Sequence, residues 1–119
     1  MKEIIAIIRP CKSYETKNLL AKKGFFALSN YQVLGKGKGA PGGAIINDVE
    51  DERKQICAPQ MHAKTLIDMY VRDCDADEVI DIITKANKTD THGDGKIFVI
   101  PCENALRIRT GEKKDEAIL

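Results

Sequence analysis

The sequence predicts an α+β domain in which one antiparallel sheet carries two helices on a single face. Three observations predict it. A pattern of strand, helix and strand occurs twice along the 119 residues, each copy begins with an apolar run rich in aliphatic residues, and each helix has apolar residues at helical spacing. The length suits one domain with one core, so we expect residues 1–119 to form a single domain.

The first copy of the pattern covers residues 4–35. The run IIAII at 4–8 is typical of a strand that is buried on one face and partly covered on the other. Ser13 is suited to cap a helix that runs to about Lys23, and Gly24 is suited to end it. Residues 25–35 then predict a second strand.

The second copy begins at residues 66–71, LIDMYV, which predict the third strand. Asp75 is suited to cap the helix that follows, with Glu78 at the position of a capping box. The run IFVI at 97–100 predicts the fourth strand, and the whole order is that of the split β-α-β, or ferredoxin-like, arrangement. The apolar stripe of the second helix consists of Val79, Ile80, Ile82, Ile83 and Ala86.

Charge and cysteine usage exclude several classes of protein. With 19 basic and 18 acidic residues the formal charge is +1, so no overall field draws the chain to nucleic acid or a membrane. The N-terminal apolar run is too short for a signal peptide or a membrane span. We therefore expect a cytoplasmic protein with reduced thiols, because four cysteines are scattered without a C-x-x-C pair. They are Cys11, Cys57, Cys74 and Cys102.

Two helices can cover only one face of the predicted sheet. All four strands carry several apolar residues, so an apolar face of several hundred Å² would stay open on a monomer, which is unusual. Self-association is the simplest way to cover it, and we expect a closed cyclic oligomer.

A long connection, residues 36–62, joins the two halves. Five glycines and Pro41 lie within residues 35–43, so the start of the connection is flexible. A connection of this length inside a small domain is usually functional, although a solvated insertion would have the same composition.

The strongest local signal for function is the run Gly93, Asp94, Gly95 and Lys96, directly before the fourth strand. Backbone N–H groups of a glycine-rich turn can converge on phosphate oxygens, and a lysine adds a point charge beside them. A tight hairpin turn would also explain the glycines.

Arg107 and Arg109 follow a few residues later. On an extended segment alternate side chains project to one side, so both guanidiniums could bind one polyphosphate. The alternative for this R-x-R pair is a solvated strand edge. Taken together, the turn and the arginines predict a phosphate-binding site.

The same residues resemble a known family. The run T-x-x-x-G-D-G-K-I-F-V at 89–99, followed by A-L-R-I-R-T-G-E at 105–112, is similar to the C-terminal signature of the PII nitrogen-regulatory signal-transduction proteins. The start MKEIIAIIRPCK and the V-L-G-K-G-K that opens the connection also match, so the resemblance covers nearly the whole chain. It implies trimers of ferredoxin-like subunits that bind ATP or ADP between subunits, with Mg²⁺ accompanying ATP. It also implies that residues 36–62 are the T-loop, which docks on a target according to bound nucleotide and 2-oxoglutarate.

The resemblance also assigns individual residues. The turn at 93–96 and both arginines would bind the nucleotide, one arginine reaching across a subunit boundary. Strand packing is an equal alternative for Ser29 and Tyr70. Arg9 and Lys64 match cations that face the carboxylates of 2-oxoglutarate. The residues that would line the other side of the nucleotide cleft are Ser29, Gly35, Gly37, Lys38, Asp68 and Tyr70.

Two features depart from the common pattern of the family. Gly39 stands where the family usually has a glutamine that helps to hold magnesium, so binding of 2-oxoglutarate is in doubt. The T-loop is longer than usual and has no Tyr, Ser or Thr between Lys36 and His62, so no hydroxyl there can be modified. The long loop and the tail most resemble the PII-like proteins of nitrogen-fixation gene clusters, which act in pairs on nitrogenase.

This implies a homotrimer, or a heteromer with a second PII protein, and nitrogenase as the candidate target. The alternative within the family is a regulator of an ammonium transporter or of glutamine synthetase. A phosphoryl-transfer enzyme with His92 as nucleophile is the alternative from another class, but the sequence offers no evident group to orient that imidazole. A metal-binding or purely structural trimer is a third reading, and the histidines and cysteines lack ligand spacing for it.

Overall fold

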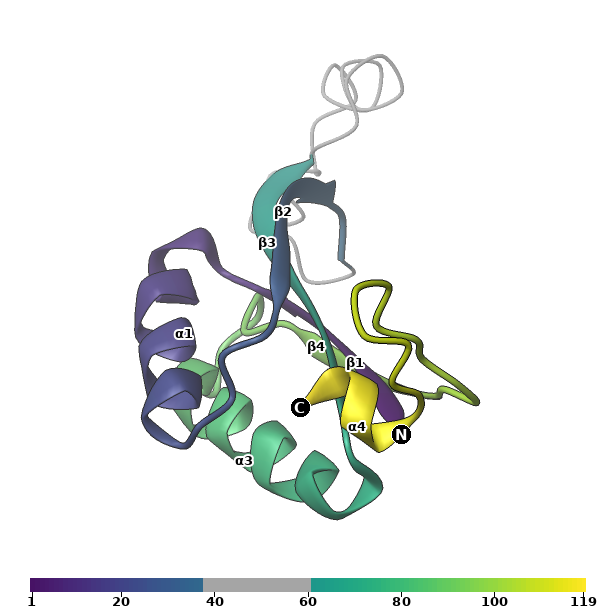
Figure 1. Cartoon of the computed structure of the whole chain (residues 1–119). Helices are drawn as coiled ribbons and strands as arrows, with labels where there is room; N and C mark the ends of the chain where they lie inside the picture. The colour runs from purple at the N-terminus through teal and green to yellow at the C-terminus, as the bar shows by residue number, and fades with distance from the viewer. Residues whose placement is uncertain (38–60) are drawn as a thin grey trace, which may run out of the picture.

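The computed structural model describes residues 1–37 and 61–119, which form a four-stranded sheet with two helices on one face (Figure 1). The order of elements, strand-helix-strand twice over, is the one that the sequence predicts. The elements are β1 (Lys2–Ile8), a 3-10 turn (Pro10–Lys12), α1 (Ser13–Lys22), β2 (Ser29–Gly35), β3 (His62–Val71), a second 3-10 turn (Asp73–Asp75), α3 (Ala76–Asn87), β4 (Lys96–Pro101) and the short α4 (Asp115–Ile118).

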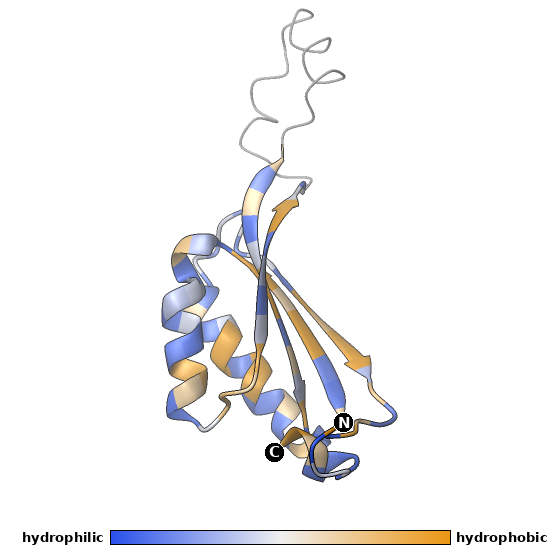
Figure 2. Ribbon diagram, turned by 45° about the horizontal axis from the view of Figure 1, so that its top comes forward, coloured by the Kyte–Doolittle hydropathy of each residue, from blue (hydrophilic) through white to orange (hydrophobic). Residues whose placement is uncertain are grey.

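The sheet has the strand order β2-β3-β1-β4, and every neighbouring pair is antiparallel. This is the ferredoxin-like topology that the sequence predicts. Helices α1 and α3 pack on one face of the sheet (Figure 2). Ile4, Ala6 and Ile8 of β1 are buried in the core on this face. Each fully buried aliphatic side chain in this core stabilises the fold by about 1.5–3 kcal/mol. The largest of them are Ile4, Ile8, Leu20, Ile67, Val79 and Ile83.

Neither predicted helix cap forms. Ser13 is the first residue of α1 and makes no capping bond, because the 3-10 turn at Pro10–Lys12 already leads the chain into the helix. Asp75 precedes α3, but its carboxylate accepts hydrogen bonds from Arg72, with Nε at 2.7 Å, instead of capping the helix. The capping box with Glu78 is therefore wrong, since an arginine competes for the capping carboxylate.

Two strand boundaries also differ from the prediction. The segment expected as a strand from residue 25 begins its strand only at Ser29, since Phe25 and Leu28 pack against the core. Strand β3 begins at His62, before the predicted 66, because it continues beyond the helices as the partner of β2, where Gly35 pairs with His62. This extension of β2 and β3 carries the two ends of the long connection, residues 36–62, away from the core (Figure 1).

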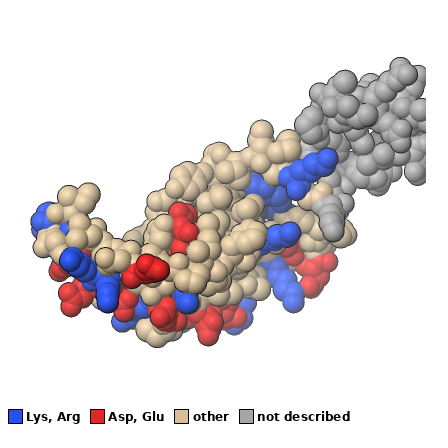
Figure 3. All heavy atoms as spheres, turned by 90° about the vertical axis from the view of Figure 1, so that its right-hand side faces the viewer, with Lys and Arg blue, Asp and Glu red and all other residues tan. Residues whose placement is uncertain are grey.

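The second face of the sheet is left open by the described elements. The side chains of Ile5, Ile7, Phe98 and Ile100 alternate with core residues, so they point to this face, where Phe98 is 47% exposed. In Figure 3, Lys and Arg side chains lie toward both ends of the view, while uncharged residues make up much of the upper middle. The apolar open face is the feature from which the sequence predicts self-association.

One polar contact on the open face joins β1 to β3. Glu3 and Tyr70 are opposite each other in the register, and the Tyr70 hydroxyl donates a hydrogen bond of 2.7 Å to Glu3 Oε2. This bond, helped by desolvation and by the negative charges of Asp68 and Glu3, raises the pKa of Tyr70 to about 12. Glu3 therefore keeps the phenol protonated.

The start of β4 lies very close to the end of β1. Gly95 has φ of +118°, and a Cβ at that position would lie 1.9 Å from the carbonyl oxygen of Ile7. Only glycine can occupy this position without a shift of the backbone.

No helix formed by residues 1–37 or 61–119 is long and apolar enough to cross a membrane.

We expect Gly95→Ala to destabilise the protein by roughly 2 kcal/mol or more, because the new methyl group would collide with the Ile7 carbonyl in a strained backbone conformation. Denaturant unfolding measures the change. Gly111→Ala is the matched control, since Gly111 has φ of +76° but nothing within 4 Å of its Cβ position. It should cost only roughly 1 kcal/mol. Equal losses in the two variants would contradict the close contact.

We expect Glu3→Gln to lower the pKa of Tyr70 from about 12 toward its ordinary value of 10.0, because the amide can still accept the bond but carries no charge. Since the pKa is raised in the folded state, this interaction stabilises the protein below pH 10 and is lost as the pH rises through about 12. Alkaline titration of tyrosinate absorbance measures the shift. The absorbance step near pH 12 that is lost in Tyr70→Phe is the step due to Tyr70. If that step stays at the same pH in Glu3→Gln, Glu3 does not raise the pKa.

Candidate anion-binding site

A cavity of about 900 Å³ opens on the uncovered face of the sheet, where the ends of β2 and β3 meet the loop between α3 and β4. Its volume lies within the range of small-molecule sites, roughly 300–1,000 Å³. Seven of the residues predicted for nucleotide or 2-oxoglutarate line it together, although they come from four separate places in the sequence. The lining residues are Ile7, Arg9, Gly35, Lys36, Gly37, His62, Ala63, Lys64, His92, Gly93, Gly95, Lys96 and Phe98.

The charges around this cavity are of one sign. Arg9, Lys36, Lys64 and Lys96 line it, together with both histidines of the chain, and no acidic residue is part of the wall formed by the described residues. Fixed cations along a concave surface concentrate anions there. Ile7 and Phe98 add an apolar patch to the wall, so an anion with a flat apolar group fits best.

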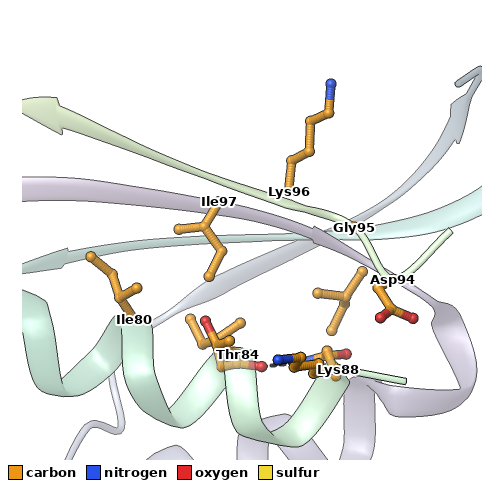
Figure 4. A pocket seen from close by; sticks show the side chains of 10 residues that line it. Ile80, Thr84, Lys88, Asp94, Gly95, Lys96 and Ile97 are labelled. Atoms are coloured by element: carbon orange, nitrogen blue, oxygen red, sulfur yellow. Dashed lines mark hydrogen bonds between the residues drawn. The ribbon is translucent and has the colours of Figure 1, made fainter. Parts of the chain in front are cut away.

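Lys96 is directed into this space by the alternation of β4. In Figure 4 its side chain points away from α3, while the side chain of the next residue, Ile97, points toward that helix. The view shows a smaller pocket of about 330 Å³ between α3 and β4, on the helix side of the sheet. Asp94, Gly95 and Lys96 thus separate the two hollows, and only the larger one is strongly cationic.

Asp94 organises the loop before β4. Its carboxylate accepts hydrogen bonds from the backbone N–H groups of Thr89 at 2.7 Å and Asp90 at 3.0 Å, from the Thr89 hydroxyl, and from Arg9 Nη1 at 2.6 Å. The bonds from Thr89, followed by that from Arg9, hold the pKa of Asp94 well below its ordinary value of 3.8. Because the pKa is lowered, this stabilisation is present above about pH 4 and is lost as the pH falls further. The carboxylate shapes the loop and does not line the large cavity.

The two cations predicted for 2-oxoglutarate hold the same loop. Arg9 Nη2 donates to the His92 carbonyl at 2.8 Å and to the Thr91 hydroxyl at 3.1 Å, in addition to its ion pair with Asp94. Lys64 Nζ donates to the Gly93 carbonyl at 2.7 Å. Gly93 permits this packing, since a Cβ there would lie 3.3 Å from Arg9 Nη2. Both cations line the cavity while they position its glycine-rich wall.

Three other predicted residues lie on the open face but do not line the cavity. Ser29 pairs with Asp68 in the register of β2 and β3, and Tyr70 is bonded to Glu3. Burial and the neighbouring Glu3 raise the pKa of Asp68. Its Oδ1 atom is buried and has no hydrogen-bond partner among the described residues. Ser29, Asp68 and Tyr70 thus form a second cluster, which lies outside the cavity of the same chain.

The two predicted arginines lie on a small hairpin after β4. The main chain closes it through Arg107 N to Glu112 O at 2.9 Å and Lys114 N to Ala105 O at 3.0 Å. The side chain of Arg107 is paired with Glu112, whereas Arg109 is exposed and makes no hydrogen bond or ion pair within the described parts of the chain. Neither arginine lines the cavity of its own chain. Lys38 and Gly39 lie outside the described residues, as does most of the T-loop.

Sequence reasoning missed several residues of the site. Lys36, His62, Ala63 and His92 line the cavity, and Ile7 and Phe98 supply its apolar part. The pairing of β2 with β3 brings His62 opposite Gly35, which has no side chain to fill the space. The pair Thr89 and Thr91 around the loop was the available signal for a network on Asp94, because short hydroxyl side chains commonly bond to nearby loop groups.

The geometry of the described residues does not support the two alternatives, a phosphoryl-transfer enzyme that uses His92 and a metal-binding protein. His92 lines the cavity, but no described residue accepts or donates a hydrogen bond at its imidazole, so nothing orients it as a nucleophile. Within residues 1–37 and 61–119, no three His, Cys, Asp or Glu side chains are grouped as a metal site. Cys11, Cys74 and Cys102 are free thiols, and Cys57 lies outside the described residues.

Comparison with known proteins places this geometry in one family. The family "Nitrogen regulatory protein P-II" matches residues 1–112. The chain is 42% identical over 125 aligned positions to "Nitrogen fixation nifHD region GlnB-like protein 2" of Methanobacterium ivanovii, with all of both chains covered. It is 37% identical over 118 positions to "Nitrogen regulatory protein P-II 2" of Methanothermobacter thermautotrophicus, covering 99% of this chain and 97% of that protein.

A solved structure agrees with the sequence comparisons. The crystal structure of Arabidopsis thaliana PII bound to citrate superposes with a TM-score of 0.75 at 26% identity, covering 98% of this chain and 88% of that one. The resemblance read from the glycine-rich turn and the R-x-R segment is thereby confirmed. This chain belongs to the nitrogen regulatory protein P-II family, whose members are regulators rather than enzymes.

Proposed function

We propose that this protein binds ATP and ADP in the large cavity and regulates a target protein through residues 36–62. The observation that carries the proposal is the cationic wall of the cavity, formed by Arg9, Lys36, Lys64 and Lys96 around the glycine-rich turn. A polyphosphate supplies the negative charge that such a wall favours, and a nucleotide base supplies the flat apolar group for Ile7 and Phe98. Mg²⁺ would enter with ATP, chiefly on its phosphate oxygens.

The predicted nucleotide residues fall into two groups, and this supports binding between subunits. Gly35, Gly37, Gly93, Gly95 and Lys96 line the cavity of their own chain, with Asp94 shaping the turn. The residues of the other group do not line the cavity of their own chain. A second copy of the chain would have to bring its residues of this group to the cavity. A closed trimer would do so while covering the apolar open face. This second group consists of Ser29, Asp68, Tyr70, Arg107 and Arg109.

For 2-oxoglutarate we propose weak binding. Arg9 is already bonded to Asp94, Thr91 and His92, and Lys64 is bonded to Gly93. A dicarboxylate would compete with these contacts, and Gly39 offers no side chain to a shared magnesium ion. Lys64 has further donors, so it remains the better candidate for a carboxylate contact.

For the target we propose nitrogenase. Several relatives are named for a nitrogen-fixation region, among them those of Methanobacterium ivanovii and Methanococcus maripaludis, and the chain matches them over nearly its full length. The long T-loop without hydroxyl side chains supports control by ligands rather than by covalent modification. Regulation of an ammonium transporter or of glutamine synthetase is the second candidate, since it uses the same loop.

Lys96→Ala and Arg109→Ala should each weaken ATP binding about tenfold or more, because each removes a charge-assisted hydrogen bond to phosphate. Calorimetric titration of ATP and ADP measures the affinities, and release of phosphate measured in the same samples should stay at background.

Lys22→Ala is the matched control, because it removes the same charge from the exposed end of α1, on the helix side of the sheet. It should leave the affinity unchanged. Equal affinities in Lys96→Ala, Lys22→Ala and the unaltered protein would rule out the cavity as the phosphate site, and steady ATP hydrolysis would rule out a pure sensor.

Replacing residues 44–56 by a Gly/Ser linker of the same length should abolish target binding and leave ATP binding intact. The reason is that the apolar and charged side chains of this interval are the candidate contacts for a partner. The cavity is lined instead by Lys36, Gly37 and His62, at the two ends of residues 36–62. Co-purification with nitrogenase from the same organism, with and without ATP, measures the effect.

The deletion of 44–56 without a linker checks whether loop length matters. Retained target binding in both variants would contradict the role of the T-loop. Detection by mass spectrometry of a nucleotidyl group within residues 36–62, in protein from nitrogen-shifted cells, would contradict control by ligands alone.

A further inference from the structure

The guanidinium of Arg107 is held from two sides by the chain that follows it. Nη1 donates to Glu112 Oε2 at 2.5 Å. Nη2 donates to the carbonyl oxygens of Glu116 at 3.3 Å, Ala117 at 3.5 Å and Leu119 at 2.5 Å. These three carbonyls lie in and just after α4, so one side chain joins the hairpin to the C-terminal turn.

The partner of Arg107 is itself held in place. Glu112 lies across the hairpin from Arg107, where its carbonyl accepts the Arg107 N–H at 2.9 Å. The Thr110 hydroxyl donates to the same Glu112 Oε2 atom at 2.9 Å. Glu112 is therefore fixed by both backbone and side-chain contacts.

Arg109 is in a different state, although it is only two residues away. Its side chain is exposed, and it forms no hydrogen bond or ion pair with residues 1–37 or 61–119. One of the two neighbouring arginines is therefore available to an anion at once, while the other must first leave its partners.

We propose that Glu112 is a positioning residue that withholds Arg107 from phosphate, so that its ion pair with Arg107 sets how tightly a polyphosphate binds. The proposal rests on the proposed function, since it concerns the same ligand. Phosphate must compete with Glu112 for Nη1, and the carboxylate cancels the charge of the guanidinium until it is displaced. The pair is 31% and 40% exposed, and partly exposed ion pairs are weak enough to exchange for a bidentate phosphate contact.

The test compares Glu112→Gln with Glu116→Gln in calorimetric titrations of the full chain with ATP, ADP and AMP. Both variants lose one negative charge from the same segment, but Glu116 contacts Arg107 only through its main-chain oxygen. We expect Glu112→Gln to bind ATP roughly threefold to fivefold more tightly. The gain should shrink from ATP to ADP to AMP with the charge of the ligand, and Glu116→Gln should show little change.

A double-mutant cycle shows whether the gain passes through Arg107. In an Arg107→Ala background, Glu112→Gln should have no further effect on ATP affinity. Equal gains in Glu112→Gln and Glu116→Gln, weaker binding in Glu112→Gln, or a gain that persists without Arg107 would each overturn the proposal while ATP binding itself stands. If the unaltered protein does not bind ATP at all, the proposed function fails, and this proposal fails with it.

Discussion

The ion pair between Arg9 and Asp94 is the contact on which the cavity depends. Arg9 follows β1 and Asp94 precedes β4, so their bond at 2.6 Å joins the ends of two neighbouring strands of the sheet. The remaining oxygen of Asp94 orders the backbone at Thr89 and Asp90, and Arg9 also binds the His92 carbonyl. With the loop held in this way, its glycines face the cavity and Lys64 of β3 reaches the Gly93 carbonyl.

This arrangement gives two charged residues a double role. Arg9 and Lys64 provide positive charge to the cavity, and they also hold the backbone that forms its wall. A ligand that recruits either cation would therefore act on the glycine-rich turn at the same time. Such a shared contact is a physical route by which a bound anion and the shape of the glycine-rich turn influence each other.

One-sided coverage of the sheet leaves several predicted site residues away from the cavity. The two helices bury one face, and the other face keeps apolar residues such as Phe98 and Ile100 exposed, with Asp68 and Tyr70 beside them. On the hairpin, Arg107 is bonded to Glu112, whereas Arg109 makes no hydrogen bond or ion pair with residues 1–37 or 61–119. The proposed trimer would cover this face and would place Asp68 and Tyr70 near the cavity of a neighbouring copy.

The sequence by itself determined the order of strands and helices, the core and the glycine-rich turn, because these depend on local patterns. Alternating apolar residues select the face of a strand, and Gly95 is required by a backbone position that no side chain fits. Only the tertiary structure decided the partners of polar side chains, because each can form hydrogen bonds with several groups and the fold sets which of them lie within reach. Asp75 bonds to Arg72 instead of capping α3, Arg9 binds a loop 80 residues away or more, and Glu112 occupies Arg107. The fold also separated the predicted site residues into two clusters, since the direction of each strand, and not its composition, sets which side chains can meet.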